Sequence, residues 1–157
     1  MKQIKNNMKE IKVKIINKSN NPNPTYETPQ SAGMDLRAYL PNKNIILWPG
    51  RTKLIPTGIY IQLSRGYEAQ IRSRSGLALK KKIRVFQAPG TIDADYRGEI
   101  GVILENANRF WPPVVIKSGQ RIAQMVIAKH ERVNFVNSIE LDDSERGEGG
   151  FGHTGVE

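Results

Sequence analysis

Short apolar runs separated by turn signals recur along most of the chain, and this punctuation limits the possible folds more than any other feature. Residues 59–63 alternate apolar and polar side chains, which is typical of a half-buried strand. Glycine- and proline-containing clusters at 64–66, 112–113 and 117–119 interrupt the runs where turns are expected. Many short strands with regular turns favour a β-sandwich or a barrel. The expected strands cover 13–16, 45–47, 59–63, 67–71, 83–86, 100–104, 114–116, 122–127 and 133–136, and a short helix is expected over 77–82.

Length and composition are those of one ordinary globular domain. The chain has 157 residues, of which 38% are hydrophobic and 25% charged, and it has no cysteine. Disulfides and thiolate metal sites are therefore excluded. No apolar run reaches membrane-spanning length, and the lysine-rich start lacks the apolar core of a signal peptide, so a cytoplasmic protein with no membrane partner is expected. We expect a basic extension over 1–11, a β domain over 12–141 and a flexible C-terminal tail over 142–157.

A net charge of +9 favours anionic partners such as phosphates or nucleotides. The lysines gather in residues 2–18 and 80–82. Aromatic residues do not interleave with either cluster, so the sequence does not indicate a stacking platform for single-stranded nucleic acid. Solvated surface charge is the preferred interpretation of both clusters, and no specific nucleic acid is expected as a partner.

The segment 91–99 carries the strongest chemical signal. Asp93, Asp95 and Glu99 surround Tyr96 within a few residues, between a Pro89-Gly90 turn and an apolar run. Carboxylates at a junction of strand and turn can hold a water or a metal, and a neighbouring aromatic ring can pack on a sugar or a base. The segment therefore suggests hydrolysis of a small polar substrate, with structural roles preferred for Asp95 and Glu99.

Four further polar clusters lie beside glycines, and each also has a simple structural explanation. Asp35 follows Gly33, where an aspartate in a turn is common. Residues 72–78 combine arginines, serines and Gly76 at the start of the expected helix, which suits phosphate binding or a serine N-cap. Gln124 interrupts an apolar strand and could simply face solvent. The tail places Arg146, Phe151 and Thr154 among glycines, which suits a phosphate and a flat ring but is also typical of a disordered end.

Taken in chain order, these five segments resemble the five motifs of the trimeric dUTP diphosphatase (dUTPase) family: the first contains Asp35, the second residues 74–76, the third Asp93 and Tyr96, the fourth Gln124 and the fifth the tail from Arg146. The resemblance runs from about residue 12 to residue 155. It implies an all-β fold, a distorted jelly-roll β-barrel with one short helix, assembled as a homotrimer. It also implies active sites shared by all three subunits and closed by the C-terminal tail.

The resemblance also implies a role for each matching residue in Mg²⁺-assisted hydrolysis of dUTP to dUMP and pyrophosphate. That reaction would limit uracil incorporation into DNA and supply dUMP for thymidylate synthesis. Asp93 would activate the attacking water, Asp35 would hold Mg²⁺ through water, and Tyr96 would pack under the deoxyribose. The implied phosphate and base contacts are Arg74, Ser75, Gly76, Gln124, Arg146, Phe151, Gly152 and Thr154, with Gln87, Thr91 and Ile92 in the base-reading hairpin of about 83–92.

Three alternatives stay open at this stage. A dCTP deaminase would share the fold, but the position of its catalytic glutamate corresponds to Ile103, and the nearest acid is Glu105. A nucleotide-binding protein without turnover is a second possibility, although Asp93 and Tyr96 are both present. A nucleic-acid binder is suggested by charge alone.

Overall fold

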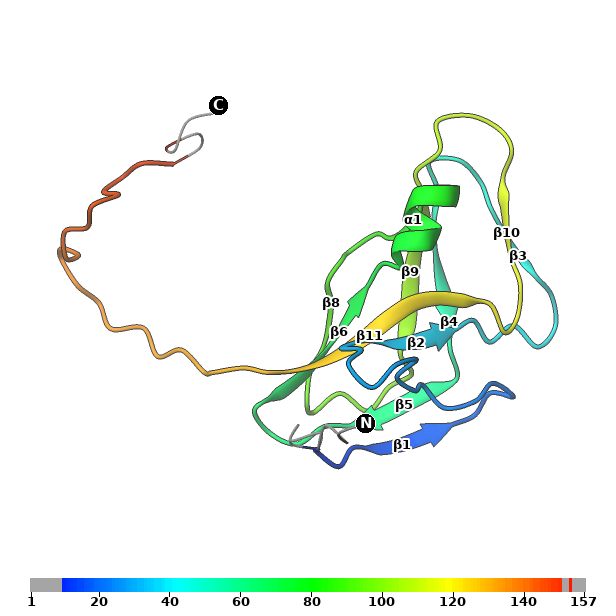
Figure 1. Cartoon of the computed structure of the whole chain (residues 1–157), viewed down its shortest axis with the longest axis horizontal. Coiled ribbons are helices and arrows are strands. Elements are labelled where there is room, and N and C mark those ends of the chain that lie inside the picture. The colour runs from blue at the N-terminus through cyan, green and yellow to red at the C-terminus, as the bar shows by residue number, and fades with distance from the viewer. Residues whose placement is uncertain (1–9, 151–152, 154–157) are drawn as a thin grey trace, which may run out of the picture.

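The structure is a computed structural model, and it describes residues 10–150 and residue 153. The described chain is mostly β, with a single helix (Figure 1). This composition confirms the expected all-β class with one short helix. The elements are β1 Lys14–Asn17, β2 Met34–Arg37, β3 Ile45–Leu47, β4 Thr52–Pro56, β5 Ile59–Gln62, β6 Tyr67–Arg72, α1 Ser75–Lys81, β7 Ile83–Val85, β8 Gly90–Ile92, β9 Gly101–Asn106, β10 Val114–Ile116 and β11 Arg121–Lys129.

Within the described residues, the strands form four small antiparallel sheets. The largest has the order β2-β11-β6-β8, and a second has the order β4-β9-β7. β1 pairs with β5, and β3 pairs with β10. The longest strand, β11, lies between β2 and β6, so it joins segments that are far apart in the sequence (Figure 1).

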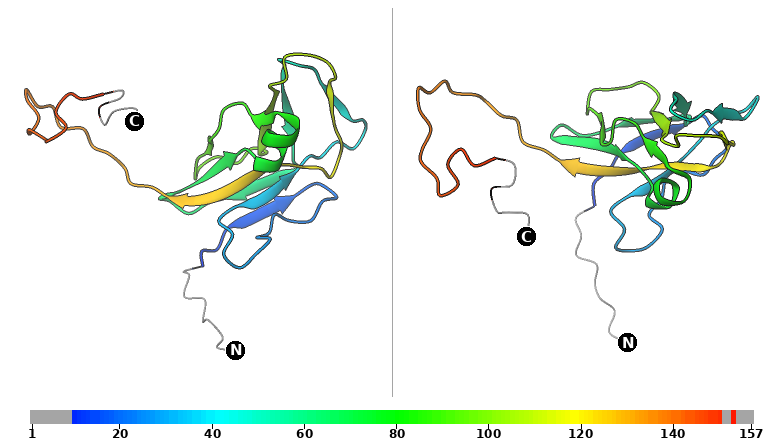
Figure 2. Two further views of the ribbon diagram at one scale, coloured as in Figure 1. Left: turned by 45° about the horizontal axis from the view of Figure 1, so that its top comes forward. Right: turned by 90° about the horizontal axis from the view of Figure 1, so that it is seen from above.

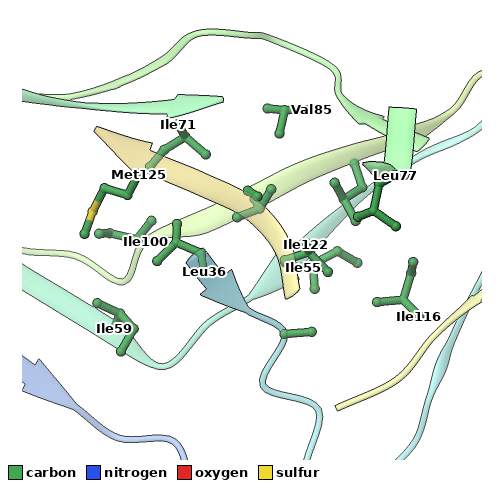
Figure 3. Packing of buried hydrophobic residues seen from close by; sticks show 14 of the residues in the cluster. Leu36, Ile55, Ile59, Ile71, Leu77, Val85, Ile100, Ile116, Ile122 and Met125 are labelled. Carbon is green, nitrogen blue, oxygen red and sulfur yellow. The ribbon is translucent and has the colours of Figure 1, made fainter. Parts of the chain in front are cut away.

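One apolar cluster lies between these sheets (Figure 3). Leu36, Ile55, Ile100 and Ile122 are almost completely buried and come from different parts of the chain. Burying one such side chain stabilises a fold by roughly 1.5–3 kcal/mol. The shared core explains why the strands form a single β domain.

The helix begins close to where the sequence placed it. Arg74 is the N-cap residue, and its side chain makes no capping hydrogen bond, so Ser75 is the first helical residue rather than a serine N-cap. Lys82 ends the helix in the left-handed conformation, with φ of 52°. Lys80 and Lys81 occupy the last turn, where positive charge complements the helix dipole.

The sequence analysis did not predict three of the strands, and one expected strand is absent from the described residues. β2, β4 and β8 are short and include polar residues, so they lack an apolar run. The expected strand at 133–136 is wrong for this chain, because the segment has no hydrogen-bonded neighbour strand and all four residues are exposed. It belongs to a segment, residues 130–150, that leaves the β domain after β11 in every view (Figures 1 and 2).

No helix in the described part of the chain is long and apolar enough to cross a membrane.

Candidate functional site

The largest sheet aligns three of the polar side chains in one row. Gln124 on β11 is directly opposite Asp35 on β2 and Arg72 on β6. Residues paired directly across antiparallel strands point to the same face of the sheet. The first, second and fourth motifs are therefore neighbours in space, although the row includes Arg72, which the sequence analysis did not single out as a site residue.

Asp35 is the electrostatic centre of this row. Its side chain is only 7% exposed, and its two carboxylate oxygens contact the Nε of Arg74 at 2.8 Å and the guanidinium of Arg121 at 3.1 Å. Arg121 also lies 3.3 Å from the carboxylate of Glu27. A buried carboxylate needs such partners, because an unpaired buried charge is costly. Asp35 thereby orients Arg74, and neither Arg121 nor Glu27 carried a signal in the sequence.

The second-motif residues surround the start of α1. Arg74 is half-buried, whereas Ser75 and Gly76 are exposed. The hydroxyl of Ser73 accepts the backbone N–H of Val85 at 2.9 Å and ties this turn to β7. The first N–H groups of a helix have no acceptor within the helix. The turn therefore presents a guanidinium, a hydroxyl and backbone donors to solvent, a set that matches phosphate oxygens.

The third motif lies beside two cavities. β8 pairs with β6, and Asp93 follows directly after β8 with an exposed side chain. Gln87, Thr91 and Ile92 help to line a cavity of about 250 Å³, together with Ile71, Val85 and the start of β9. Asp93 itself faces a larger and more open cavity of about 1000 Å³ beside Arg65, Arg97 and His130. The three residues expected in the base-reading hairpin therefore share one small cavity.

Tyr96 has a fixed position on the turn after Asp93. Its hydroxyl donates to the backbone carbonyl of Glu99 at 3.0 Å, and its backbone N–H donates to the carbonyl of Asp93 at 3.1 Å. The ring lies directly over Gly98, since a Cβ added there would come within 2.3 Å of the Tyr96 oxygen. No local sequence pattern indicates this requirement for glycine at position 98.

Glu99 has a structural role, as the sequence analysis preferred. Its Oε1 accepts the backbone N–H groups of Thr57 at 3.0 Å and Gly58 at 2.7 Å. Arg97 instead donates to the backbone carbonyls of Ala94 and Tyr96. The two hydrogen bonds of Glu99 attach the third-motif turn to the connection between β4 and β5.

The polar row and the side chain of Ile71, which lines the small cavity, point to opposite sides of the largest sheet. Ile71 and Arg72 are consecutive residues of β6, and consecutive side chains of a strand point to opposite faces. Ile71 lines the cavity, whereas Arg72 belongs to the row with Gln124 and Asp35. The polar row therefore points away from the part of the cavity wall that Ile71 forms.

The last motif lies away from both groups. Arg146 is exposed, and its Nε donates to the carbonyl of Gly149 at 2.7 Å within the extended C-terminal segment. Phe151, Gly152 and Thr154 lie outside the described residues. The roles expected for these four residues stay predictions.

Sequence comparison identifies close relatives over most of the chain. The family model described as dUTPase matches residues 19–155. The chain is 56% identical to the deoxyuridine 5′-triphosphate nucleotidohydrolase of Cytophaga hutchinsonii over 143 residues, which cover 91% of each protein. It is 52% identical to the enzyme of the same name from Finegoldia magna over 145 residues, covering 92% of this chain and 99% of the relative.

Solved structures have the same fold. A mutant dUTPase of Staphylococcus bacteriophage 80alpha with dUpNHpp superimposes with a TM-score of 0.79 at 25% identity, covering 92% of this chain and 99% of that one. A mutant dUTPase of phage phi11 of S. aureus, which coordinates a structural Mg(II) ion, has a TM-score of 0.75 at 20% identity over 85% of this chain and 100% of its own. The matching fold, motif order and identities above one half together place this chain in the dUTPase family.

Proposed function

We propose that the chain hydrolyses dUTP to dUMP and pyrophosphate and is a deoxyuridine 5′-triphosphate nucleotidohydrolase. The observation that carries this function is the position of Asp93 at the end of β8, directly after the two residues that line the small cavity. Family membership and two relatives of that name at over 50% identity support the same activity. The reaction would keep uracil out of DNA and supply dUMP.

Asp93 acts as the general base in this proposal. Water is a poor nucleophile at neutral pH, so a carboxylate within hydrogen-bond reach must take its proton. The exposed side chain of Asp93 can reach a water, and no described arginine or lysine is within ion-pair distance of it. The water would attack the α-phosphorus, and pyrophosphate would leave.

The phosphates would contact Arg74, Ser75, Gly76 and Gln124. Phosphoryl transfer depends mainly on positioning and on neutralising charge. The carboxylate of Asp35 and the backbone carbonyl of Arg121 hold the guanidinium of Arg74 in place, which lowers the cost of ordering it on the substrate. Arg146, Phe151, Gly152 and Thr154 would close over the γ-phosphate and the uracil and exclude bulk water.

The small cavity would receive the uracil, and Tyr96 would pack under the sugar. A volume of about 250 Å³ suits a ring and part of a deoxyribose. Gln87, Thr91 and Ile92 offer backbone and side-chain groups along one wall. Hydrogen bonds in such a cavity would reject cytosine, because mismatched polar groups would be left unpaired.

Magnesium is the cofactor in this proposal, with Asp35 acting through water. Both Asp35 oxygens already contact arginines, and no cluster of three or more acidic, histidine or cysteine side chains occurs among the described residues. This donor set does not fit direct ligation by several carboxylates. It fits an ion held by phosphate oxygens and retained waters, which would polarise the phosphates.

A homotrimer with shared active sites is also part of the proposal. The polar row and Ile71, which lines the base cavity, point to opposite faces of one sheet, so in this proposal a single dUTP takes its groups from two copies. Residues 130–141 carry apolar side chains that are almost fully exposed, including Phe135 at 90% and Ile139 at 103%. Such a segment needs a covering surface, and a neighbouring copy supplies one. The β domain would then include residues up to 141, as expected.

The deaminase alternative finds little support. Ile103 has no polar group, and Glu105 forms an ion pair with Arg84 at 2.5 Å. Neither residue can serve as a base beside Asp93. Ammonia release from dCTP would be the observation in favour of deamination.

The decisive experiment measures pyrophosphate release from dUTP, dTTP, dCTP and UTP, with and without Mg²⁺. We expect turnover of dUTP only, and only with Mg²⁺. The Asp93→Asn variant should keep nucleotide binding and lose turnover by roughly a hundred-fold or more. An Asp95→Asn variant is the control, because Asp95 has no assigned part in the chemistry. Equal turnover by Asp93→Asn and the unmodified enzyme would remove the general-base assignment.

A further inference from the structure

A cluster of exposed aromatic residues lies at the end of the domain where β3, β9 and β10 meet their loops. Trp111 is 71% exposed, Phe110 is 78% exposed and Trp48 is 46% exposed. The two tryptophan rings lie 5.3 Å apart at an interplanar angle of 54°. Large aromatic side chains gathered on a surface usually mark a binding site. These residues line neither cavity and do not belong to the polar row.

The structure joins this aromatic cluster to the lysines at the end of α1. Asn108 donates to the carbonyl of Lys81 at 2.9 Å, and the backbone N–H of Ala107 donates to the carbonyl of Lys82 at the same distance. Arg109 and Phe110 follow directly, and two residues of extended chain span at most about 7 Å. The sequence analysis treated Lys80–Lys82 as lacking aromatic neighbours, but folding supplies them from a distant loop.

Asn106 makes this end of the domain rigid. It is fully buried, its side-chain amide donates to the carbonyl of Leu47 at 2.9 Å, and its Oδ1 accepts from Asn108. Its backbone N–H and carbonyl bond to Arg51 and Gly50. One residue thus fixes the turn that carries Trp48 relative to the loop that carries Phe110 and Trp111.

The surrounding charge is positive. Residues 36–67, 69–92 and 106–130 contain no aspartate or glutamate. Glu105, directly before Asn106, contacts Arg84 at 2.5 Å, and this hydrogen bond raises the pKa of the arginine. Arg51, Lys80, Lys81, Lys82 and Arg109 belong to these segments, and none of them forms an ion pair within the described part of the chain. A second copy would bring the same cations to the contact, which disfavours self-association through this surface.

We propose that this aromatic and basic surface binds single-stranded nucleic acid without sequence preference. Bases would stack on Trp111, Phe110 and Trp48, while the cations contact the phosphates. Exposed aromatic rings beside lysines and arginines are the combination that holds single strands, because every base has a flat face and every nucleotide a charge. Trp48, Phe110 and Trp111 line neither cavity and are not part of the polar row around Asp35.

The test uses a natural property of the chain, since Trp48 and Trp111 are its only tryptophans. A labelled oligothymidine of about 20 nucleotides, long enough for several stacked bases, is titrated against the full chain without Mg²⁺. We expect quenched tryptophan fluorescence, increased anisotropy of the label and weaker binding as salt rises. Phe110→Leu with Trp111→Leu keeps an apolar side chain at both positions but removes the stacking faces, and should weaken binding about ten-fold or more.

Matched variants distinguish the contributions of base stacking, of charge and of nonspecific hydrophobic binding. Lys80→Gln with Lys81→Gln should reduce the salt dependence, whereas Lys12→Gln with Lys14→Gln, near β1 at the opposite end of Figure 1, should not. Leu79→Ala removes an exposed apolar residue of α1 and should leave binding unchanged. All variants should keep dUTP hydrolysis, which also shows that they fold. The proposal is overturned by any of three results: no salt-sensitive binding, displacement of the strand by a non-hydrolysable dUTP analogue, or an equal signal from phosphatidylserine vesicles.

Discussion

At the scale of single residues, the turn after Asp93 requires glycine at position 98. The Tyr96 ring occupies the space where any residue other than glycine at position 98 would place its Cβ. Gly98→Ala should therefore displace the ring without touching the substrate. We expect discrimination between dUTP and UTP to fall by about ten-fold or more, because the ring would no longer exclude the 2′-hydroxyl. Relative kcat/KM values for the two nucleotides measure the change.

Two variants of Tyr96 give reference values with which the effect of Gly98→Ala can be compared. Tyr96→Ala should lose discrimination at least as severely as Gly98→Ala. Tyr96→Phe should retain it, because the ring stays and only the hydrogen bond to the Glu99 carbonyl disappears. Unchanged selectivity in both Tyr96→Ala and Gly98→Ala would show that the ring does not recognise the sugar.

Glu99 contributes to stability through two backbone hydrogen bonds. Glu99→Ala should leave the N–H groups of Thr57 and Gly58 without an acceptor, and both residues are buried. We expect a loss of about 1–3 kcal/mol in the free energy of unfolding, measured by urea denaturation at fixed protein concentration. Glu99→Gln keeps a side-chain oxygen and should cost much less. Equal effects of the two substitutions would contradict this interpretation.

At the scale of elements, the segment after β11 has two separable parts. A chain ending after Glu145 lacks the fifth motif and should lose nearly all activity while remaining trimeric. A chain ending after Glu131 also lacks the exposed apolar residues, including Phe135 and Ile139, and should no longer form trimers. Light scattering coupled to size-exclusion chromatography distinguishes the two cases. A fully active chain without Arg146 would remove the closing role of the tail.

The elements also show what the sequence could and could not predict. Strands with apolar runs, such as β5 and β11, were predicted because their pattern follows from burial of a face. β2 was missed because Asp35 interrupts its apolar residues, and that carboxylate is buried only with the help of two arginines. The ion pair with Arg121 and the fit of Gly98 under Tyr96 arise from tertiary contacts, which no local pattern records. The five motifs carried the family assignment, whereas the alignment of Asp35, Gln124 and Arg72 in one row needed the structure.

At the scale of the whole molecule, shared sites make a prediction about mixed assemblies. Arg74→Ala and Asp93→Asn should each be inactive alone, since each removes one half of every site. Co-expressed chains should regain activity, because some sites would combine an intact Asp93 from one chain with an intact Arg74 from another. Random mixing would restore about a quarter of the sites if two neighbouring chains contribute to each. Pyrophosphate release from purified mixed trimers measures this, and no recovery in trimers shown to contain both variants would place each site within one chain.

The placement of the polar row and of Ile71 on opposite faces has a consequence for the newly made protein. A newly synthesised chain would contain every motif, yet it could not hydrolyse the nucleotide before it assembled with other copies. Activity would then depend on protein concentration. Strong dilution would dissociate the assembly and abolish activity, and reassociation would restore it, with no inhibitor or processing step required.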